Sequence, residues 1–138
     1  MCHYALCTEK LAVKIDLDTL PKDEYRIDGY QNGVISVNGN AFSSSLIISP
    51  AHLIVDWRPD NFDDLATQHI AQIIELEPEI IILGTGDQLY FPSPDLIAAI
   101  FENHIGFEVM DTGAACRCYN LLLSERRKVA AGLIRIPK

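Results

Sequence analysis

The sequence predicts one α/β domain built on a mixed β-sheet that includes parallel strands. Its 138 residues are 49% hydrophobic and 22% charged, which is ordinary for a single domain with a buried core. Strand patterns dominate up to about residue 60, and helical and strand patterns alternate after it. Helices between consecutive strands favour parallel pairs joined by right-handed crossovers. We therefore expect an N-terminal segment at residues 1–10 and one globular domain at residues 11–138.

The first half of the chain is expected to form strands. Apolar and charged residues alternate over residues 11–17, as in a half-buried strand. Asn38-Gly39 lies between two apolar stretches and tolerates positive φ, which predicts a β-hairpin. Ser49-Pro50 interrupts the pattern, because proline has no N–H to donate to a ladder. The expected strands are residues 11–17, 25–30, 34–37, 41–48 and 53–57.

The second half is expected to alternate helices with strands. Apolar residues recur at helical spacing over residues 62–77, and Asp60 or Asn61 can cap the start of this helix. Residues 80–83 are apolar at every position, as a central strand covered on both faces requires. The expected helices are residues 62–77, 94–106 and 112–125, and the expected strands are residues 80–83, 107–110 and 129–136.

Two short sequences mark element boundaries in this half. Ser93-Pro94 places a capping hydroxyl before a proline at the first helical position. Residues 126–128 are too short for a crossover connection. The strand at 129–136 is therefore expected to run antiparallel to its neighbour or to skip one strand.

The charge balance disfavours several classes of partner. Eleven Lys and Arg residues against 19 Asp and Glu give a net charge of −8, which repels nucleic acid and anionic lipid. The apolar runs are far shorter than the roughly 20 residues of a membrane span. The first residues do not match a signal peptide. We expect a cytoplasmic protein without nucleic-acid binding or membrane insertion.

Two glycine-containing turns, at residues 84–86 and 111–113, form the candidate binding site. Each follows a predicted strand, and clefts in open sheets form at the carboxyl ends of parallel strands. The N–H groups at the start of the helix at 112–125 would favour an anion there. The alternative is that the glycines only allow a tight strand exit, while Asp111 or Thr112 caps the helix. The candidate ligand-binding residues are Gly84, Thr85, Gly86, Asp111, Thr112, Gly113 and Cys116.

The cysteines are expected to be free thiols that share no metal. Cys116 and Cys118 lie two positions apart on a predicted helix, so their side chains point about 200° away from each other. Cys118 falls among apolar positions and is expected to be the buried thiol. Cys116 lies nearer the polar strip, and its place in the first turns of the helix would lower its pKa in a reactive role; a packed thiol is the favoured alternative, because burial is the common fate of free cysteine.

The histidines and the N-terminal cysteines match no catalytic or metal-binding pattern. His69 and His104 lie in apolar helical arcs and are expected in the core. Cys2, His3 and Cys7 match no zinc pattern, and no strong catalytic signature occurs. The helix at 112–125 is expected to have a polar strip and a packed face. The polar strip comprises Arg117, Asn120 and Ser124, and the packed face comprises Tyr119, Leu122 and Leu123.

A composite motif resembles a known family of small domains of unknown biochemical activity. The resemblance covers about residues 11–136, and the family includes a mitochondrial respiratory complex I assembly factor and an adipogenesis-associated domain protein. It implies a three-layer α/β fold with a central mixed sheet, helices against it and an additional β layer from the N-terminal half. Cys118 stands where the family usually has Thr, and Arg126 stands where many members have Gly. The matching residues are 107–117, 119–122, 125–127, 42–48, 80–86, Trp57 and Pro59.

Arg126 is thereby expected in the left-handed conformation at the end of its helix. The resemblance and the lack of a catalytic signature favour a non-enzymatic protein-binding domain similar to an assembly factor. The alternative is a small-ligand (anion) binding protein or an enzyme that uses the crevice at the two turns. We expect no cofactor and no metal. The expected partner is another protein, and self-association into a homo-oligomer stays open.

Overall fold

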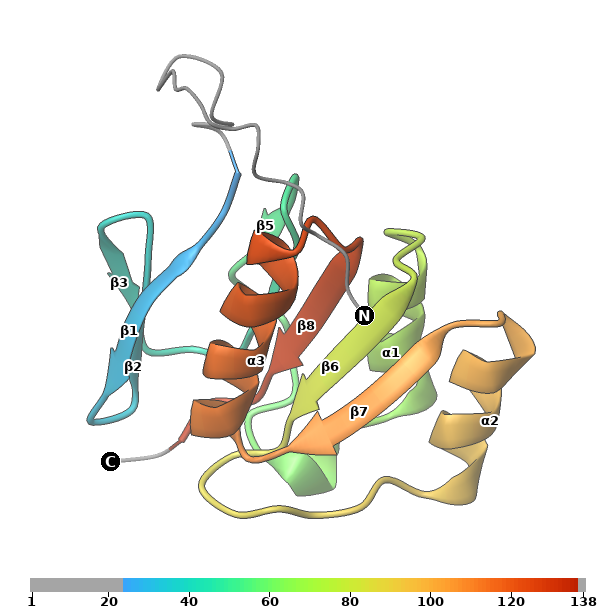
Figure 1. The fold of residues 1–138 in the computed structure, drawn as a ribbon. Helices are drawn as coiled ribbons and strands as arrows, with labels where there is room; N and C mark the ends of the chain where they lie inside the picture. Colours follow the sequence, from blue (N-terminus) through green and yellow to red (C-terminus); the bar gives the residue numbers. More distant parts are fainter. Residues whose placement is uncertain (1–23, 137–138) are drawn as a thin grey trace.

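The large β-sheet is mixed in strand direction (Figure 1). The computed structural model describes residues 24–136. Within that range the strands of this sheet are β4 (Leu46–Ile48), β5 (Leu53–Ile54), β6 (Ile80–Gly84), β7 (Gly106–Met110) and β8 (Val129–Leu133). Their order is β5-β4-β8-β6-β7, with β6 parallel to β7 and β8, and β4 antiparallel to β5 and β8. The predicted α/β class with a mixed sheet is confirmed.

Strand β8 is separated from β7 by one strand of the large sheet. After β7 the chain forms α3 (Thr112–Ser124), passes over β6 and returns as β8 on its far side. The crossover therefore skips one strand, as predicted, and the other neighbour of β8, β4, is antiparallel. The expected strand at 11–17 and the segment at 1–10 lie outside the described residues.

A second, small antiparallel sheet comes from the N-terminal part of the described chain. Its strands are β1 (Ile27–Gln31), β2 (Val34–Val37) and β3 (Asn40–Phe42), in that order. Asn38-Gly39 reverses the chain between β2 and β3 with φ of +49° and +87°, which confirms the predicted hairpin.

The expected strand at 41–48 is divided between the two sheets. The Ser45 hydroxyl donates to Pro59 O (2.6 Å) and accepts from Arg135 N (2.9 Å), so the chain is held where it leaves the small sheet. It enters the large sheet at Leu46. The expected strand at 53–57 is also shorter, because Trp57 leaves the ladder and donates its indole N–H to His69 O (3.2 Å).

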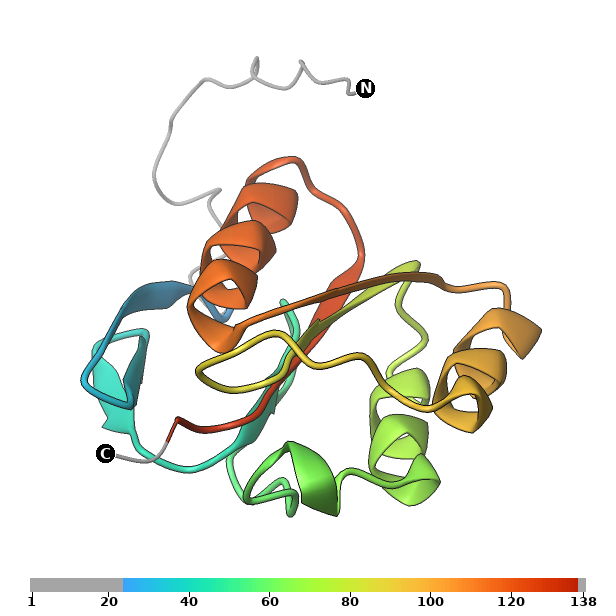
Figure 2. The same ribbon diagram turned by 90° about the horizontal axis from the view of Figure 1, so that it is seen from below.

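The helices cover the two faces of the large sheet unequally (Figures 1 and 2). One face packs against α3 and the small sheet, and the opposite face packs against α1 (Thr67–Ile74) and α2 (Pro94–Glu102). Along β6, Ile82 faces the α3 side, whereas Ile81 and Leu83 face the other helices. The fully apolar run at 80–83 thus fills both cores, and the layered arrangement matches the fold that the family resemblance implies.

The first of the predicted helices is divided into two elements in the structure. The predicted helix at 62–77 is divided into a 3₁₀ turn, η3 (Phe62–Asp64), and α1, because Leu65 and Ala66 are extended. Asn61 caps η3, and His69 Nδ1 accepts from Ala66 N (2.9 Å) to cap α1.

The second and third helices end at residues with positive φ. His104 has φ +59° and Arg126 has φ +63°, so the left-handed conformation expected for Arg126 is confirmed. His104 follows the end of α2 and is exposed, so its expected place in the core is wrong. The apolar pattern there continues past the point where the helix stops. His69 is half-buried beside Trp57, with ring centroids 6.3 Å apart.

Candidate functional site

The two glycine-containing turns lie side by side at one edge of the large sheet, as predicted. Thr85 N donates to Met110 O (2.9 Å), and Thr112 N donates to Gly86 O (2.8 Å). Gly86 N returns a hydrogen bond to Thr112 Oγ1 (2.9 Å). The register of the parallel β6–β7 pair brings the turns together, because both follow the same ends of neighbouring strands.

The space between the turns is filled by the Thr112 side chain. Its hydroxyl accepts from Gly86 N and donates to Ile134 O (2.7 Å), and the residue is fully buried. A Cβ added at Gly84 would lie 2.9 Å from Thr112 Oγ1 and 3.1 Å from Ala115 Cβ. We call this contact between Thr112, Gly84, Gly86 and Ile134 the Thr112 joint. It ties the start of α3 to β6 and β8.

The first turn of α3 already has acceptors for two of its N–H groups. Asp111 is the N-cap, and its Oδ1 accepts from Ala114 N (2.8 Å). Thr112 N is paired with Gly86 O. The Asp111 carboxylate therefore supplies, from within the chain, the negative charge that a helix N-terminus attracts.

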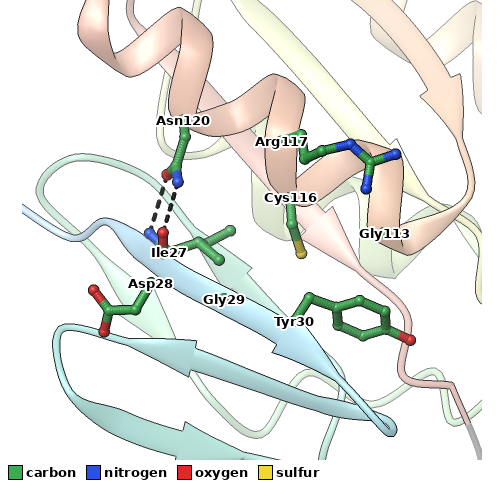
Figure 3. Close-up of a pocket in the computed structure, with 8 residues that line it drawn as sticks. All are labelled: Ile27, Asp28, Gly29, Tyr30, Gly113, Cys116, Arg117 and Asn120. Carbon is green, nitrogen blue, oxygen red and sulfur yellow. Dashed lines mark hydrogen bonds between the residues drawn. The ribbon is translucent and has the colours of Figure 1, made fainter.

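A pocket of about 280 Å³ lies beside the joint, between β1 and α3 (Figure 3). Of the seven predicted site residues, Gly113 and Cys116 line it, and the other five do not. The strand that forms its second wall lies more than 80 residues from α3 in the sequence, so no local pattern indicated it. The lining residues are Ile27, Asp28, Gly29, Tyr30, Gly113, Cys116, Arg117 and Asn120.

Asn120 fixes the distance between β1 and α3 at one end of this pocket. Ile27 N donates to Asn120 Oδ1 (3.1 Å), and Asn120 Nδ2 donates to Ile27 O (2.6 Å) (Figure 3). The side-chain amide thus satisfies both backbone groups of one residue, as a neighbouring strand would. This pair of bonds holds the small sheet against α3.

Cys116, not Cys118, is the buried thiol of α3. Its sulfur points from α3 toward β1 (Figure 3), and the residue is only 3% exposed. Burial raises the pKa of Cys116 to about 12, with Arg117 opposing the rise and Asp111 adding to it. The packed thiol favoured for Cys116 is confirmed and the reactive alternative is wrong, because the small sheet covers this side of the helix. Cys118 also packs against the core but is only half-buried. A thiol held neutral in this way is a poor nucleophile.

Tyr30 closes the other end of the pocket. Its ring lies beside Gly113, where a Cβ would come within 3.6 Å of two ring carbons. Burial raises the pKa of Tyr30, and the charge that Cys116 carries only at high pH and the negative charges of Asp111 and Asp87 add to the rise. Tyr30 is therefore a neutral phenol at physiological pH, and it acts in the pocket as an aromatic wall with a hydroxyl.

The predicted faces of α3 are confirmed. Arg117 is exposed, whereas Leu122 is half-buried. Tyr119 is fully buried, and its hydroxyl donates to Tyr25 O (2.7 Å). Asn120 belongs to the polar strip but is half-buried, because it binds β1.

Neither a group of metal ligands nor a membrane-spanning helix is found among residues 24–136. In residues 24–136, no three His, Cys, Asp or Glu side chains are grouped so that they could hold a metal ion. Cys2, His3 and Cys7 lie outside that range. Over the same residues, no helix has the length and hydropathy needed to cross a membrane.

The fold and the joint together define a small mixed α/β domain in which a separate β-sheet is held against the helix that follows β7. A family model described as "Protein of unknown function (DUF498/DUF598)" matches residues 27–134. The chain belongs to this family.

Relatives and a solved structure agree with this membership. The bovine protein named NADH dehydrogenase [ubiquinone] 1 alpha subcomplex assembly factor 3 is 33% identical over 113 residues, 80% of this chain and 61% of its own length. The chain thus spans less than two thirds of that relative. A Francisella tularensis protein named 13 kDa major membrane protein is 31% identical over 76% of this chain and 86% of its own length. A crystal structure of a Bordetella parapertussis protein superimposes with a TM-score of 0.77 at 29% identity, covering 81% of this chain and 96% of that one.

Proposed function

We propose that this chain is a non-enzymatic protein-binding domain that acts in the assembly of a larger protein complex. The observation that carries the proposal is the Thr112 joint. Its buried hydroxyl occupies the space between the two turns where a small ligand would otherwise sit. The one thiol of the pocket is held neutral, which removes the strongest nucleophile beside the joint. The assembly-factor names of several relatives support the same class of function.

A small-ligand site for an anion is the second candidate. The pocket between β1 and α3 favours it, because Arg117 lies on the rim and extends toward Gly113 (Figure 3). In this alternative Gly113 and Cys116 contact the ligand. The remaining five candidates, Gly84, Thr85, Gly86, Asp111 and Thr112, hold that end of α3 in place.

Two experiments separate these functions. The full chain, tagged at its native level in its own cell, is purified by affinity and then by size exclusion. A protein partner in fixed stoichiometry supports the assembly role, and a chain that elutes alone contradicts it.

For the second candidate, inorganic phosphate is titrated while the Gly113 and Arg117 amide resonances are followed. Unmoved resonances at millimolar phosphate reject the anion site.

The proposed location of this interaction is the cytoplasm. The net charge of −8 supports it, because an acidic chain is repelled by anionic lipid. Fractionation of native cells tests it, with particular force because one relative is named a major membrane protein. Recovery of the chain in the membrane pellet after a high-salt wash would contradict the cytoplasmic location.

A further inference from the structure

The loop between β6 and α2 carries the largest run of exposed apolar side chains among the described residues. Leu89 is 48% exposed, Tyr90 43% and Phe91 73%. The other exposed large hydrophobic residues in the described range, Val55, Phe101 and Leu121, occur singly along the chain. We call residues 87–92 the apolar loop; it is the yellow segment that precedes α2 in Figure 2. Single exposed apolar side chains are ordinary, but three consecutive ones are characteristic of an interaction surface.

The apolar loop is held in a defined shape from within. The buried Thr85 hydroxyl donates to Gln88 O (2.5 Å) and accepts from Tyr90 N (3.2 Å). The Tyr90 ring stacks on Phe62 of η3, with centroids 5.3 Å apart and planes 24° apart. An ordered loop loses little conformational entropy when a partner binds it, so its apolar area contributes to affinity more fully.

Carboxylates lie on both sides of the three exposed apolar residues along the chain. Asp87 precedes Leu89 by two residues, and Asp95 follows Phe91 by four. Across the Phe62–Tyr90 contact, η3 adds Asp63 and Asp64. All four of these acidic residues are exposed. The complementary surface is therefore apolar at its centre and positively charged at its rim.

We propose that the apolar loop inserts Leu89 and Phe91 into an apolar pocket of a partner protein whose rim carries Lys and Arg. This inference rests on the proposed function and adds to it the docking surface and the chemistry of the partner. A protein is favoured over an anionic membrane, because the flanking carboxylates repel anionic headgroups. The Thr112 joint has an indirect role, since its bond to Gly86 N holds the start of the loop.

The test compares two phenylalanine variants of the full chain. Phe91→Ser removes the most exposed side chain of the loop, and Phe101→Ser is the matched control on α2, where the side chain is 57% exposed. Both side chains are mostly in solvent, so both variants are expected to fold, which circular dichroism verifies. Each is purified from native cells as above. The partner recovered with the wild-type chain is then purified, and its Kd for each variant is measured by calorimetry.

We expect Phe91→Ser to weaken binding by about tenfold or more, as loss of a buried aromatic anchor does, and Phe101→Ser by less than about twofold. Raising the salt concentration should also weaken wild-type binding. Equal Kd values for both variants and the wild type would overturn the docking surface and leave the proposed function intact. Absence of any partner with the wild-type chain would overturn both.

Two further outcomes would assign the apolar loop to a different occupant. The full chain is sedimented with vesicles of phosphatidylcholine, with and without phosphatidylserine, and its mass alone is measured by light scattering. We expect no co-sedimentation and no loop-dependent dimer. Vesicle binding or dimerisation that Phe91→Ser abolishes and Phe101→Ser retains would overturn the protein-pocket assignment.

Discussion

At the scale of single residues, the fold depends on side chains that replace backbone partners. The Thr112 hydroxyl pairs with one N–H and one carbonyl from two different strand ends, and the Asn120 amide pairs with both backbone groups of Ile27. Each of these side chains is at least half-buried, so loss of either would leave polar backbone groups without partners. Stability, rather than chemistry at a bound ligand, is the first property we expect them to control.

The Thr112 joint can be tested by removing only its hydroxyl. Thr112→Val keeps the side-chain volume but leaves Gly86 N and Ile134 O unpaired, so we expect a loss of about 2 kcal/mol in the free energy of unfolding. Urea denaturation measures it. Thr112→Ser keeps the hydroxyl and should lose less than the valine variant. A valine variant as stable as the wild type would show that these bonds contribute nothing.

The close approach at Gly84 makes a second prediction. Gly84→Ala places a methyl group 2.9 Å from Thr112 Oγ1 and 3.0 Å from its Cα, so α3 must shift. Overpacking of this kind costs about 1–3 kcal/mol. Gly29→Ala is the matched control, since its Cβ would meet nothing within 4 Å. Urea denaturation of the two variants should separate them, and equal midpoints would refute the close packing.

The buried Cys116 thiol predicts a pH dependence of stability. In the unfolded chain a thiol titrates near pH 8.5, whereas in the folded chain burial raises the pKa of Cys116 to about 12. Above pH 8.5 the unfolded state loses this proton first, so stability is full below that pH and falls as pH rises toward 12. We expect a loss of about 2 kcal/mol between pH 7 and pH 10.

Cys116→Ala provides the comparison for the pH series. It lacks the titrating group, so the alkaline fall in its free energy of unfolding should be smaller than that of the wild type. The difference between the two proteins isolates Cys116 from other groups, such as Tyr119, whose pKa is also raised, first by burial and then by Glu24. Parallel curves for the two proteins would mean that the Cys116 thiol is accessible to water in the folded state.

At the scale of elements, sequence patterns predicted helix caps and turns, but they did not predict packing between elements that lie far apart in the sequence. Ser93 and Asp111 cap their helices, and Asn38-Gly39 turns its hairpin, because those signals lie within a few residues of their effect. The general tendency of free cysteine to be buried favoured a packed Cys116, but the element that covers it was not predictable in this way. The burial depends on β1, which lies more than 80 residues away, and the helical pattern alone left that side of α3 uncovered.

The candidate site follows the same division. The adjacency of the two turns was predicted from the rule that parallel strands end at the same edge, and the structure places them so. The Thr112 hydroxyl fills the gap between the turns because α3 lies close to β6 at this point. The spacing of residues in the sequence does not show how closely a helix approaches a strand. The pocket wall formed by β1 was missed because β1 lies far from α3 in the sequence.

The contact between β1 and α3 yields a prediction at this scale. Asn120→Ala removes both bonds to Ile27, so the amides of β1 (Ile27–Gln31) should exchange hydrogen faster, by about tenfold or more. Asn103→Ala, which removes an exposed bond to Ala99 O, should leave β1 unchanged. Hydrogen exchange read by NMR resolves the two variants. Unchanged protection of β1 in Asn120→Ala would show that packing alone holds the small sheet.

At the scale of the whole molecule, the described residues 24–136 combine a packed framework with a run of three consecutive exposed apolar side chains. The Thr112 joint and the contact between β1 and α3 are directed inward, whereas the apolar loop places its side chains in solvent next to carboxylates. A net charge of −8 over a 138-residue chain gives long-range attraction to a basic partner and repulsion from anionic surfaces. In the proposed function, the apolar loop is the docking surface and the acidic charge favours a basic partner.

The mass of the native assembly tests this account most directly. The full chain, tagged at its native level and released from cells without denaturant, is measured by size exclusion with multi-angle light scattering, and its components are identified by mass spectrometry. We predict a complex with a constant mass well above the 15.4 kDa of the chain, containing a second protein in fixed stoichiometry. A chain that elutes alone at its monomer mass, at every dilution and from every growth condition, would contradict the protein-binding function.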